Sequence, residues 1–246
     1  MNDLHSIDLI RTRYLRILDD ITTAKKRAFN QSVQVVVVTK TQPISTLQMA
    51  MAAGVEKFGE NYTEEALAKI NAINNKNIEW HMIGHIQSRK AHLVANNFKL
   101  IHSVDSVKIS NRLNSFCEPS KKLSVLLEVN VSGEATKNGF PAWDESSWDK
   151  LAGDFEEISK LPNLVIHGLM TMAPLFMNRE LARPYFVKTR RLQEYLISAL
   201  PNNNWSELSM GTSSDYIVAV EEGATYVRIG EAILGKRDVK GVHTDG

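Results

Sequence analysis

The sequence of 246 residues lacks the features that mark a secreted or membrane-spanning chain. It contains one cysteine, Cys117, which excludes an intrachain disulfide. No apolar run approaches the roughly 20 residues that cross a bilayer, and the first residues do not combine a basic segment with an apolar one. We therefore expect a cytoplasmic protein that does not associate with a membrane.

An excess of charge of one sign is also missing. The 29 Lys and Arg residues are balanced by 28 Asp and Glu residues, which leaves a net charge of +1. No overall field would therefore attract nucleic acid or an anionic membrane. One basic group lacks aromatic residues for base stacking and is interpreted as a solvated helix face; its members are His85, Arg89, Lys90 and His92. Any anion site must be local.

Short strands alternate with helices along the chain. The run 33–40, Val-Gln-Val-Val-Val-Val-Thr-Lys, is nearly continuous valine and is typical of a buried parallel strand. Seven more strands are predicted at 56–59, 78–83, 100–103, 123–129, 164–168, 205–209 and 226–229. Helices are predicted between them, from Ile44 to a C-cap at Gly54 and at 63–72, 88–96, 106–116, 146–159, 184–199 and 214–222.

One further helix precedes the first strand. Apolar residues recur there at alternating spacings of three and four, which predicts a single buried stripe formed by Ile7, Ile10, Tyr14, Ile17, Ile21, Ala24 and Ala28. Pro184 suits the first position of the long late helix, where its missing N–H costs nothing. The buried face of that helix is expected to hold Tyr185, Leu192, Leu196 and Ala199.

The alternation predicts an α/β fold. Strand–helix–strand units imply right-handed crossovers and a parallel sheet, and eight units in this length favour a closed (β/α)8 TIM barrel with an extra N-terminal helix. The absence of Gly-x-Gly-x-x-Gly after the first strand argues against a dinucleotide-binding fold. No linker interrupts the pattern, so residues 1–246 are expected to form a single domain. The longest irregular loop, 132–147, is a candidate flexible lid.

Lys40 is the main candidate for chemistry. Active sites of such barrels lie at the C-terminal ends of strands, and Lys40 closes the first predicted strand. A lysine in this place is most often a solvated charge. A stem among valines would instead desolvate the amine and favour its neutral form, which is the nucleophile in Schiff-base formation. Both interpretations stay open on the residues alone.

The loops after the seventh and eighth strands are where such barrels often bind phosphate. The first of them, 209–215, reads Ser-Met-Gly-Thr-Ser-Ser-Asp and runs directly into a helix. Ser213 or Ser214 would serve there as an N-cap, or the hydroxyls and N–H groups would together form an anion cradle. In the second loop, Gly230 permits a close approach of the backbone to a ligand.

Arg228 is an exception in an apolar strand, and a buried charge needs a partner. That partner is either a carboxylate in a salt bridge or a ring nitrogen of a ligand. His81 and His85 have the i, i+4 spacing of zinc-binding helices. Because 78–83 is predicted as a strand, in which four residues span about 13 Å, we do not expect these histidines to bind one metal ion.

Eight short segments occur in order from the first predicted strand to the last: Val38–Thr41, Phe58–Tyr62, Trp80–Gly84, His102–Asp105, Glu128–Val131, His167–Met170, Ser209–Asp215 and Val227–Gly230. Together they resemble the YggS/PROSC family of pyridoxal 5′-phosphate (PLP) homeostasis proteins. The resemblance covers nearly the whole chain, and the combination is far more specific than any one segment.

The resemblance implies the fold of the N-terminal barrel of alanine racemase, without that enzyme's second domain. It implies that Lys40 holds PLP as an internal aldimine and that Ser213, with the amides of Ser214 and Gly230, holds the phosphate. Arg228 would face the pyridine nitrogen, and the residues near the ring would be Asn61 and Met210. A cationic arginine disfavours protonation of that nitrogen, which makes PLP a weaker electron sink.

These implications favour a non-catalytic protein of PLP homeostasis, which stores, delivers or regulates the cofactor. The expected partners are PLP and PLP-dependent apoenzymes, and the absence of the second domain implies a monomer. Two alternatives stay open: a PLP-dependent amino-acid racemase, and a phosphate-binding barrel enzyme in which Lys40 forms a Schiff base with a sugar phosphate.

The sequence departs from the family pattern at three positions. Proline, asparagine and methionine are common where His85, Arg89 and Thr212 stand. Lys40 is unaffected, but details of the barrel mouth need not follow the family. Lys137, in the 132–147 loop, is interpreted as a solvated lysine, with the role of an acceptor for departing PLP as the alternative.

Overall fold

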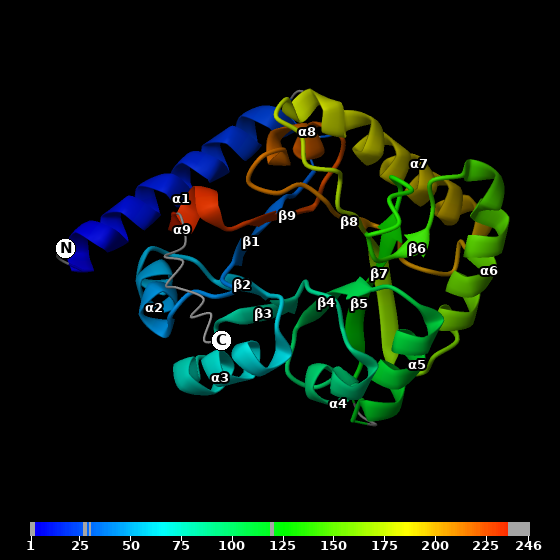
Figure 1. The fold of residues 1–246 in the computed structure, drawn as a ribbon, viewed down its shortest axis with the longest axis horizontal. Coiled ribbons are helices and arrows are strands. Elements are labelled where there is room, and N and C mark those ends of the chain that lie inside the picture. Colours follow the sequence, from blue (N-terminus) through cyan, green and yellow to red (C-terminus); the bar gives the residue numbers. More distant parts are fainter. Residues whose placement is uncertain (1–2, 27–28, 30, 119–120, 236–246) are drawn as a thin grey trace, which may run out of the picture.

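The computed structural model describes residues 3–26, 29, 31–118 and 121–235 and shows a closed barrel of parallel strands, viewed along its axis in Figure 1. All neighbouring strands pair in parallel, and the pairings of β1 with β9 and of β4 with β5 close the ring. The predicted (β/α)8 barrel is therefore confirmed. Its strands are β1 (Gln34–Val38), β2 (Lys57–Glu60), β3 (Glu79–Met82), β4 (Leu100–Val104), β5 (Leu123–Asn130), β7 (Leu164–Met170), β8 (Glu207–Ser209) and β9 (Tyr226–Ile229).

Helices surround the ring of strands (Figure 1). They are α1 (Asp3–Lys25), α2 (Ile44–Ala52), α3 (Thr63–Ile73), α4 (Ala91–Val94), α5 (Val107–Phe116), α6 (Trp148–Ser159), α7 (Arg183–Ala199), α8 (Tyr216–Glu221) and α9 (Glu231–Leu234). The extra N-terminal helix α1 packs against α2, α8 and α9. Its predicted stripe is buried or partly buried from Ile7 to Ala24, and Ala28 lies outside the described residues. Within the described ranges, every helix is too short or too polar to span a bilayer.

Some elements differ from the prediction. The first strand ends at Val38 instead of Lys40, because the chain turns through Thr41, whose φ of 62° lies in the left-handed region. The predicted helix at 88–96 is reduced to a 3₁₀ turn, η1 (Ser88–Lys90), and α4. Pro184 is the second residue of α7, and Ala199 is exposed. The additional elements are β6 (Phe140–Pro141), η2 (Glu145–Ser147), η3 (Arg179–Ala182) and α9.

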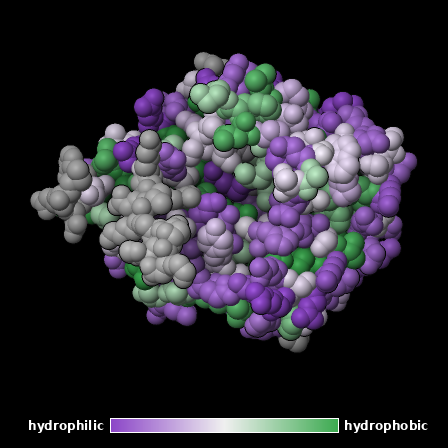
Figure 2. Space-filling model, viewed as in Figure 1, coloured by the Kyte–Doolittle hydropathy of each residue, from purple (hydrophilic) through white to green (hydrophobic). Residues whose placement is uncertain are grey.

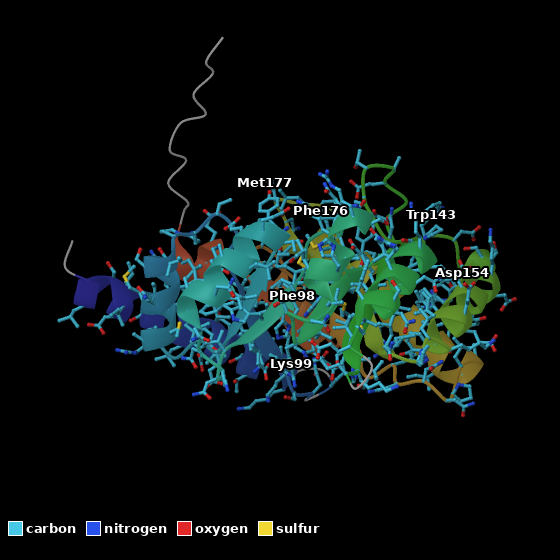
Figure 3. All side chains as sticks on the ribbon, turned by 90° about the horizontal axis from the view of Figure 1, so that it is seen from below. Phe98, Lys99, Trp143, Asp154, Phe176 and Met177 are labelled. Carbon is cyan, nitrogen blue, oxygen red and sulfur yellow. The ribbon has the colours of Figure 1, made fainter. Side chains whose placement is uncertain are left out.

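The barrel separates two groups of apolar side chains. Val35 and Val37, on one face of β1, belong to the large core between the strands and the helices. A smaller cluster consists of Leu100, Leu126 and Met170, with Tyr226 packed against it. The side view in Figure 3 places Phe176 and Met177, which follow β7, at the upper rim and Lys99, which precedes β4, at the lower edge. The carboxyl ends of the strands therefore form the upper, open end.

Candidate functional site

The carboxyl ends of the strands surround a cavity of about 680 Å³. Figure 2 shows that the molecule is hollowed near the centre of this face and that hydrophilic residues gather there. Met210, predicted near a ligand ring, is fully buried and is not among the lining residues, so its role stays a prediction. The other six predicted site residues all line the cavity: Lys40, Asn61, Ser213, Ser214, Arg228 and Gly230.

The backbone on both sides of Lys40 is fixed by a buried ion cluster on α3 and β2. The Lys69 ammonium donates to the carbonyl of Thr39 at 2.7 Å, to Glu60 Oε1 at 2.7 Å and to Glu65 Oε1 at 2.5 Å. The amide of Thr41 donates to the same Glu65 oxygen at 2.6 Å. Lys69 and Glu60 are almost fully buried. The turn that carries Lys40 is therefore held from the residue before it and the residue after it.

The loop after β8 is shaped by Gly211 and Asp215. Gly211 has a φ of 92°, and a Cβ at this position would lie 2.6 Å from that of Ala219, so no other residue fits. The N-cap position of α8 is Asp215, whose carboxylate accepts from the amide of Thr212 at 2.6 Å. The interpretation of Ser213 or Ser214 as the N-cap is therefore wrong, since the helix begins later than the sequence suggested.

The Ser213 and Ser214 side chains line the cavity together with the loop at Gly230. The amide of Ala232 donates a long bond of 3.5 Å to the Ser213 hydroxyl, which links the loop after β8 to α9, the helix that follows β9. Thr212 Oγ1 lies 3.3 Å from Ser214 Oγ. The loop after β8 thus supplies hydroxyl groups and the neighbouring loop after β9 supplies the backbone at Gly230 to the lining of one cavity, an arrangement suited to an anion.

Arg228 lies inside the barrel with 4% of its surface exposed. Its guanidinium donates to Ser209 Oγ at 2.6 Å, to the carbonyl of Thr171 at 2.9 Å and to Met172 Sδ at 2.8 Å. All three acceptors are neutral, and no carboxylate in the described part of the chain forms an ion pair with it. The salt-bridge interpretation is therefore wrong. Burial lowers the pKa of Arg228 to about 10, so the side chain stays charged at neutral pH.

Glu128, which the sequence did not single out, also lines the cavity and is 8% exposed. No described residue donates a hydrogen bond to its carboxyl group. Burial and the charge of Asp105 raise the pKa of Glu128 to about 7, while Arg228 and His85 oppose that shift. Glu128 could have been found in the sequence as the one acidic side chain within the apolar run 123–129. A charged side chain in an apolar strand is the feature that identified Arg228.

His81 and His85 occupy different environments. His81 is buried on β3, and its Nδ1 lies 2.8 Å from His102 Nε2. The half-exposed His85 follows the strand, and its Nδ1 lies 2.7 Å from Asp105 Oδ2. Among the described residues, no three potential metal-binding side chains converge on one point. The strand predicted at 78–83 is confirmed.

Lys137 forms an ion pair and a hydrogen bond with nearby residues. Its ammonium pairs with Glu134 at 2.5 Å and donates to the carbonyl of Met172 at 3.0 Å. Its loop is organised by Asn130, whose side-chain oxygen accepts from the amides of Ser132 and Gly133. The role of this loop as a lid stays a prediction.

Comparisons with known proteins agree with this geometry. The profile of the family described as "Alanine racemase, N-terminal domain" matches residues 15–238. The pyridoxal phosphate homeostasis protein of Vibrio alginolyticus is 42% identical over 214 residues, which cover 85% of this chain and 88% of that protein. The protein of the same name from Escherichia coli is 34% identical over 247 residues, with coverages of 97% and 98%.

Solved structures also resemble this chain over most of its length. PipY of Synechococcus elongatus, solved without PLP and with PLP bound, superposes with TM-scores of 0.81 and 0.79. In both cases the identity is 31%, and the match covers 92% of this chain and all of PipY. An alanine racemase of Clostridium difficile, at 15% identity and a TM-score of 0.66, shares the fold over 59% of its length. The chain therefore belongs to the family of pyridoxal phosphate homeostasis proteins, built on the alanine racemase N-terminal domain.

Proposed function

We propose that this chain binds PLP covalently through Lys40 and stores it or delivers it to PLP-dependent apoenzymes, without turning over a substrate of its own. One observation carries the proposal: an amine, an anion cradle and a buried guanidinium line the same cavity. PipY, 31% identical over its whole length, has been solved with PLP bound. The curated relatives at 34% and 42% identity are named for PLP homeostasis.

The residues present fit the three parts of PLP. The amine of Lys40 suits the aldehyde, the hydroxyls of Ser213 and Ser214 with the backbone at Gly230 suit the phosphate, and Arg228 suits the ring nitrogen. Bound PLP supplies an electron sink whose strength depends on a protonated ring nitrogen. Because Arg228 is cationic and only donates hydrogen bonds, it favours the unprotonated nitrogen. The site therefore suits holding PLP better than using it.

The absorbance spectrum tests this function directly. We expect the purified protein loaded with PLP to show a visible band that is absent in Lys40→Ala and retained in Lys160→Ala, a matched change at an exposed lysine. Borohydride reduction is expected to leave a phosphopyridoxyl group on the Lys40 peptide, detected by its mass. An unmodified Lys40 peptide, or a sugar-phosphate adduct in its place, would contradict the proposal.

A second candidate function, amino-acid racemisation, is favoured by Glu128 alone. This carboxyl lines the cavity, and its pKa of about 7 suits a group that moves protons near neutral pH. Exchange of the α-proton of an amino acid in deuterated water, abolished by Glu128→Gln, would support it. We expect no such exchange.

We also propose that the protein is a monomer, which light scattering of the purified chain tests.

A further inference from the structure

A line of hydrogen-bonded polar side chains crosses the inside of the barrel from β9 to β3. Arg228 donates to Ser209 Oγ at 2.6 Å, Ser209 Oγ lies 2.7 Å from His102 Nδ1, and His102 Nε2 lies 2.8 Å from His81 Nδ1. All four residues are at least 96% buried. The interior of such a barrel is normally filled by branched apolar side chains, so this line needs an explanation.

The positions of the hydrogen atoms along this line follow from Arg228, its first residue. A guanidinium has only donors, so the Ser209 oxygen accepts from Arg228. Among the described residues, His102 Nδ1 is the only other hydrogen-bond partner of Ser209 Oγ, so the Ser209 hydroxyl donates to it. His102 then carries its proton on Nε2 and donates it to His81 Nδ1, which leaves the proton of His81 on its own Nε2. With both rings neutral, this order makes each an Nε2–H tautomer, and the donors along the line all run in one direction, from β9 to β3.

The surroundings favour these neutral rings. Burial lowers the pKa of both histidines, that of His102 well below its usual range. The other end of the line is His81 Nε2, which has no hydrogen-bond partner in the described part of the chain and lies 3.7 Å from the carboxylate of Glu79. The other charged groups that act on the line are Lys57 and Lys99 at this end, and Glu128 and Asp215 at Arg228. The Tyr226 ring packs against both imidazoles.

We propose that Ser209, His102 and His81 are positioning residues that hold the Arg228 guanidinium in one orientation, with its full positive charge directed at the ring nitrogen of bound PLP. The inference rests on the proposed function. A carboxylate in the place of Ser209 would neutralise Arg228. A serine that donates its hydroxyl proton to His102 accepts a hydrogen bond from Arg228 and leaves the charge of the guanidinium unchanged. The two histidines matter because they keep the serine proton pointing away from the guanidinium.

The first test uses the wild-type protein without PLP. ¹H–¹⁵N NMR of the imidazole nitrogens between about pH 5 and 8, the range in which free histidine titrates, is expected to show two buried, neutral Nε2–H rings. Assignment uses His81→Gln and His102→Gln. A charged ring, or a proton on Nδ1 of His102, would overturn the inference, and no variant has to bind PLP for this result.

The second test measures the ligand. Ser209→Ala is expected to weaken PLP binding about tenfold, the effect of losing one hydrogen bond to a charged group. The pH at which the visible band is half converted is expected to rise. Without Ser209 the guanidinium is held less firmly, so it opposes protonation of the PLP ring nitrogen less. The Lys40 peptide is still expected to carry the reduced adduct. Ser110→Ala, which removes a buried hydroxyl on α5 outside the barrel, is expected to change none of these readouts.

These outcomes separate the inference from the proposed function. Wild-type affinity and an unchanged midpoint in Ser209→Ala would overturn the inference and leave the function intact. A wild-type protein that binds no PLP would overturn both. If Ser209→Ala unfolds, Ser209→Cys replaces it, since a thiol keeps a donor and an acceptor at this position but is a weaker acceptor. That variant is expected to show smaller changes in the same directions.

Discussion

Glu128 presents a buried carboxyl group to the cavity without a donor from the described part of the chain. Such a group either keeps its proton or takes a partner from a ligand. In the folded protein without ligand it holds the proton below about pH 7, since burial and Asp105 raise its pKa to about that value. Arg228, the other buried charge of the site, is cationic at neutral pH. The cavity therefore combines a fixed positive charge with an acid that titrates near neutrality.

The raised pKa of Glu128 predicts how stability depends on pH. The folded chain binds this proton more tightly than the unfolded chain, whose glutamates titrate near 4.5. The contribution of Glu128 to stability is therefore complete below about pH 4.5 and is lost as the pH rises through about 7, a loss on the order of 3 kcal/mol. Glu128→Gln stays neutral, so we expect it to be more stable than wild type at pH 8 and to lack this slope.

Urea unfolding of the two proteins at about pH 5 and pH 8 measures the difference. Glu157→Gln is the matched control, because Glu157 is exposed on α6 and its replacement should leave the wild-type slope unchanged. Equal pH slopes in wild type and Glu128→Gln would mean that Glu128 is ionised in the folded protein throughout this range.

At the scale of elements, α3 fixes the turn that carries Lys40. Lys69 reaches from α3 to the carbonyl of Thr39 and to Glu60 at the end of β2, so one ammonium joins a helix and two strand ends. Breaking a buried ion pair by removing one partner is costly because the other charge stays buried. Burial already raises the pKa of Glu60, and Lys69 opposes that shift. The cluster thus contributes both to stability and to the position of Lys40.

Lys69→Met is therefore expected to lower the free energy of unfolding by about 3–5 kcal/mol and to weaken PLP binding. The double variant with Lys69→Met and Glu60→Gln no longer has the unpaired charge of Glu60, so part of the stability is expected to return. The hydrogen bond to the Thr39 carbonyl is still missing in it. Lys160→Met, at an exposed ion pair on α6, should change stability by less than about 0.5 kcal/mol. Denaturant unfolding and PLP titration measure the two effects. Full recovery of binding in the double variant would show that Lys69 does not position Lys40.

Elements with strong periodicity were predictable, and short ones were not. All eight barrel strands lie within a residue or two of the predicted ranges. The clearest is β1, because a strand covered on both faces needs nearly continuous apolar residues and its valine run supplies them. The helix at 88–96 was overextended, since its pattern holds one turn of α-helix after a 3₁₀ turn. β6 and α9, of two and four residues, are too short for a periodic pattern. β6 is defined by its pairing with β5, and α9 packs against α1.

At the scale of the whole molecule, sequence reasoning failed where contacts join distant residues. That Lys40, Ser213 and Gly230 line one cavity was predictable, because the barrel topology alone brings strand ends together. The line through the barrel was not, since His102 and Ser209 are 107 residues apart and neither lies in a pattern typical of a polar pair. The acceptor of Arg228 was likewise missed, because a neutral serine gives no charge signal in the sequence.

The distribution of the site over the barrel leads to the last prediction. Its residues come from the ends of β1, β2, β8 and β9, and the pairing of β1 with β9 is one of those that close the ring. PLP should therefore bind the folded chain and not the unfolded one. At a free concentration 100 times its Kd, PLP would add about 2.7 kcal/mol, which for a chain of this size raises Tm by roughly 5–10 °C.

Thermal unfolding followed by circular dichroism measures this shift as a function of PLP concentration. Pyridoxal, which has the aldehyde but no phosphate, is the matched ligand and should raise Tm much less, because it cannot use the cradle at Ser213 and Ser214. Ser213→Ala should reduce the shift with PLP and leave that with pyridoxal unchanged. If both ligands raise Tm equally, the loops after β8 and β9 do not hold the phosphate, and Lys40 alone accounts for the binding.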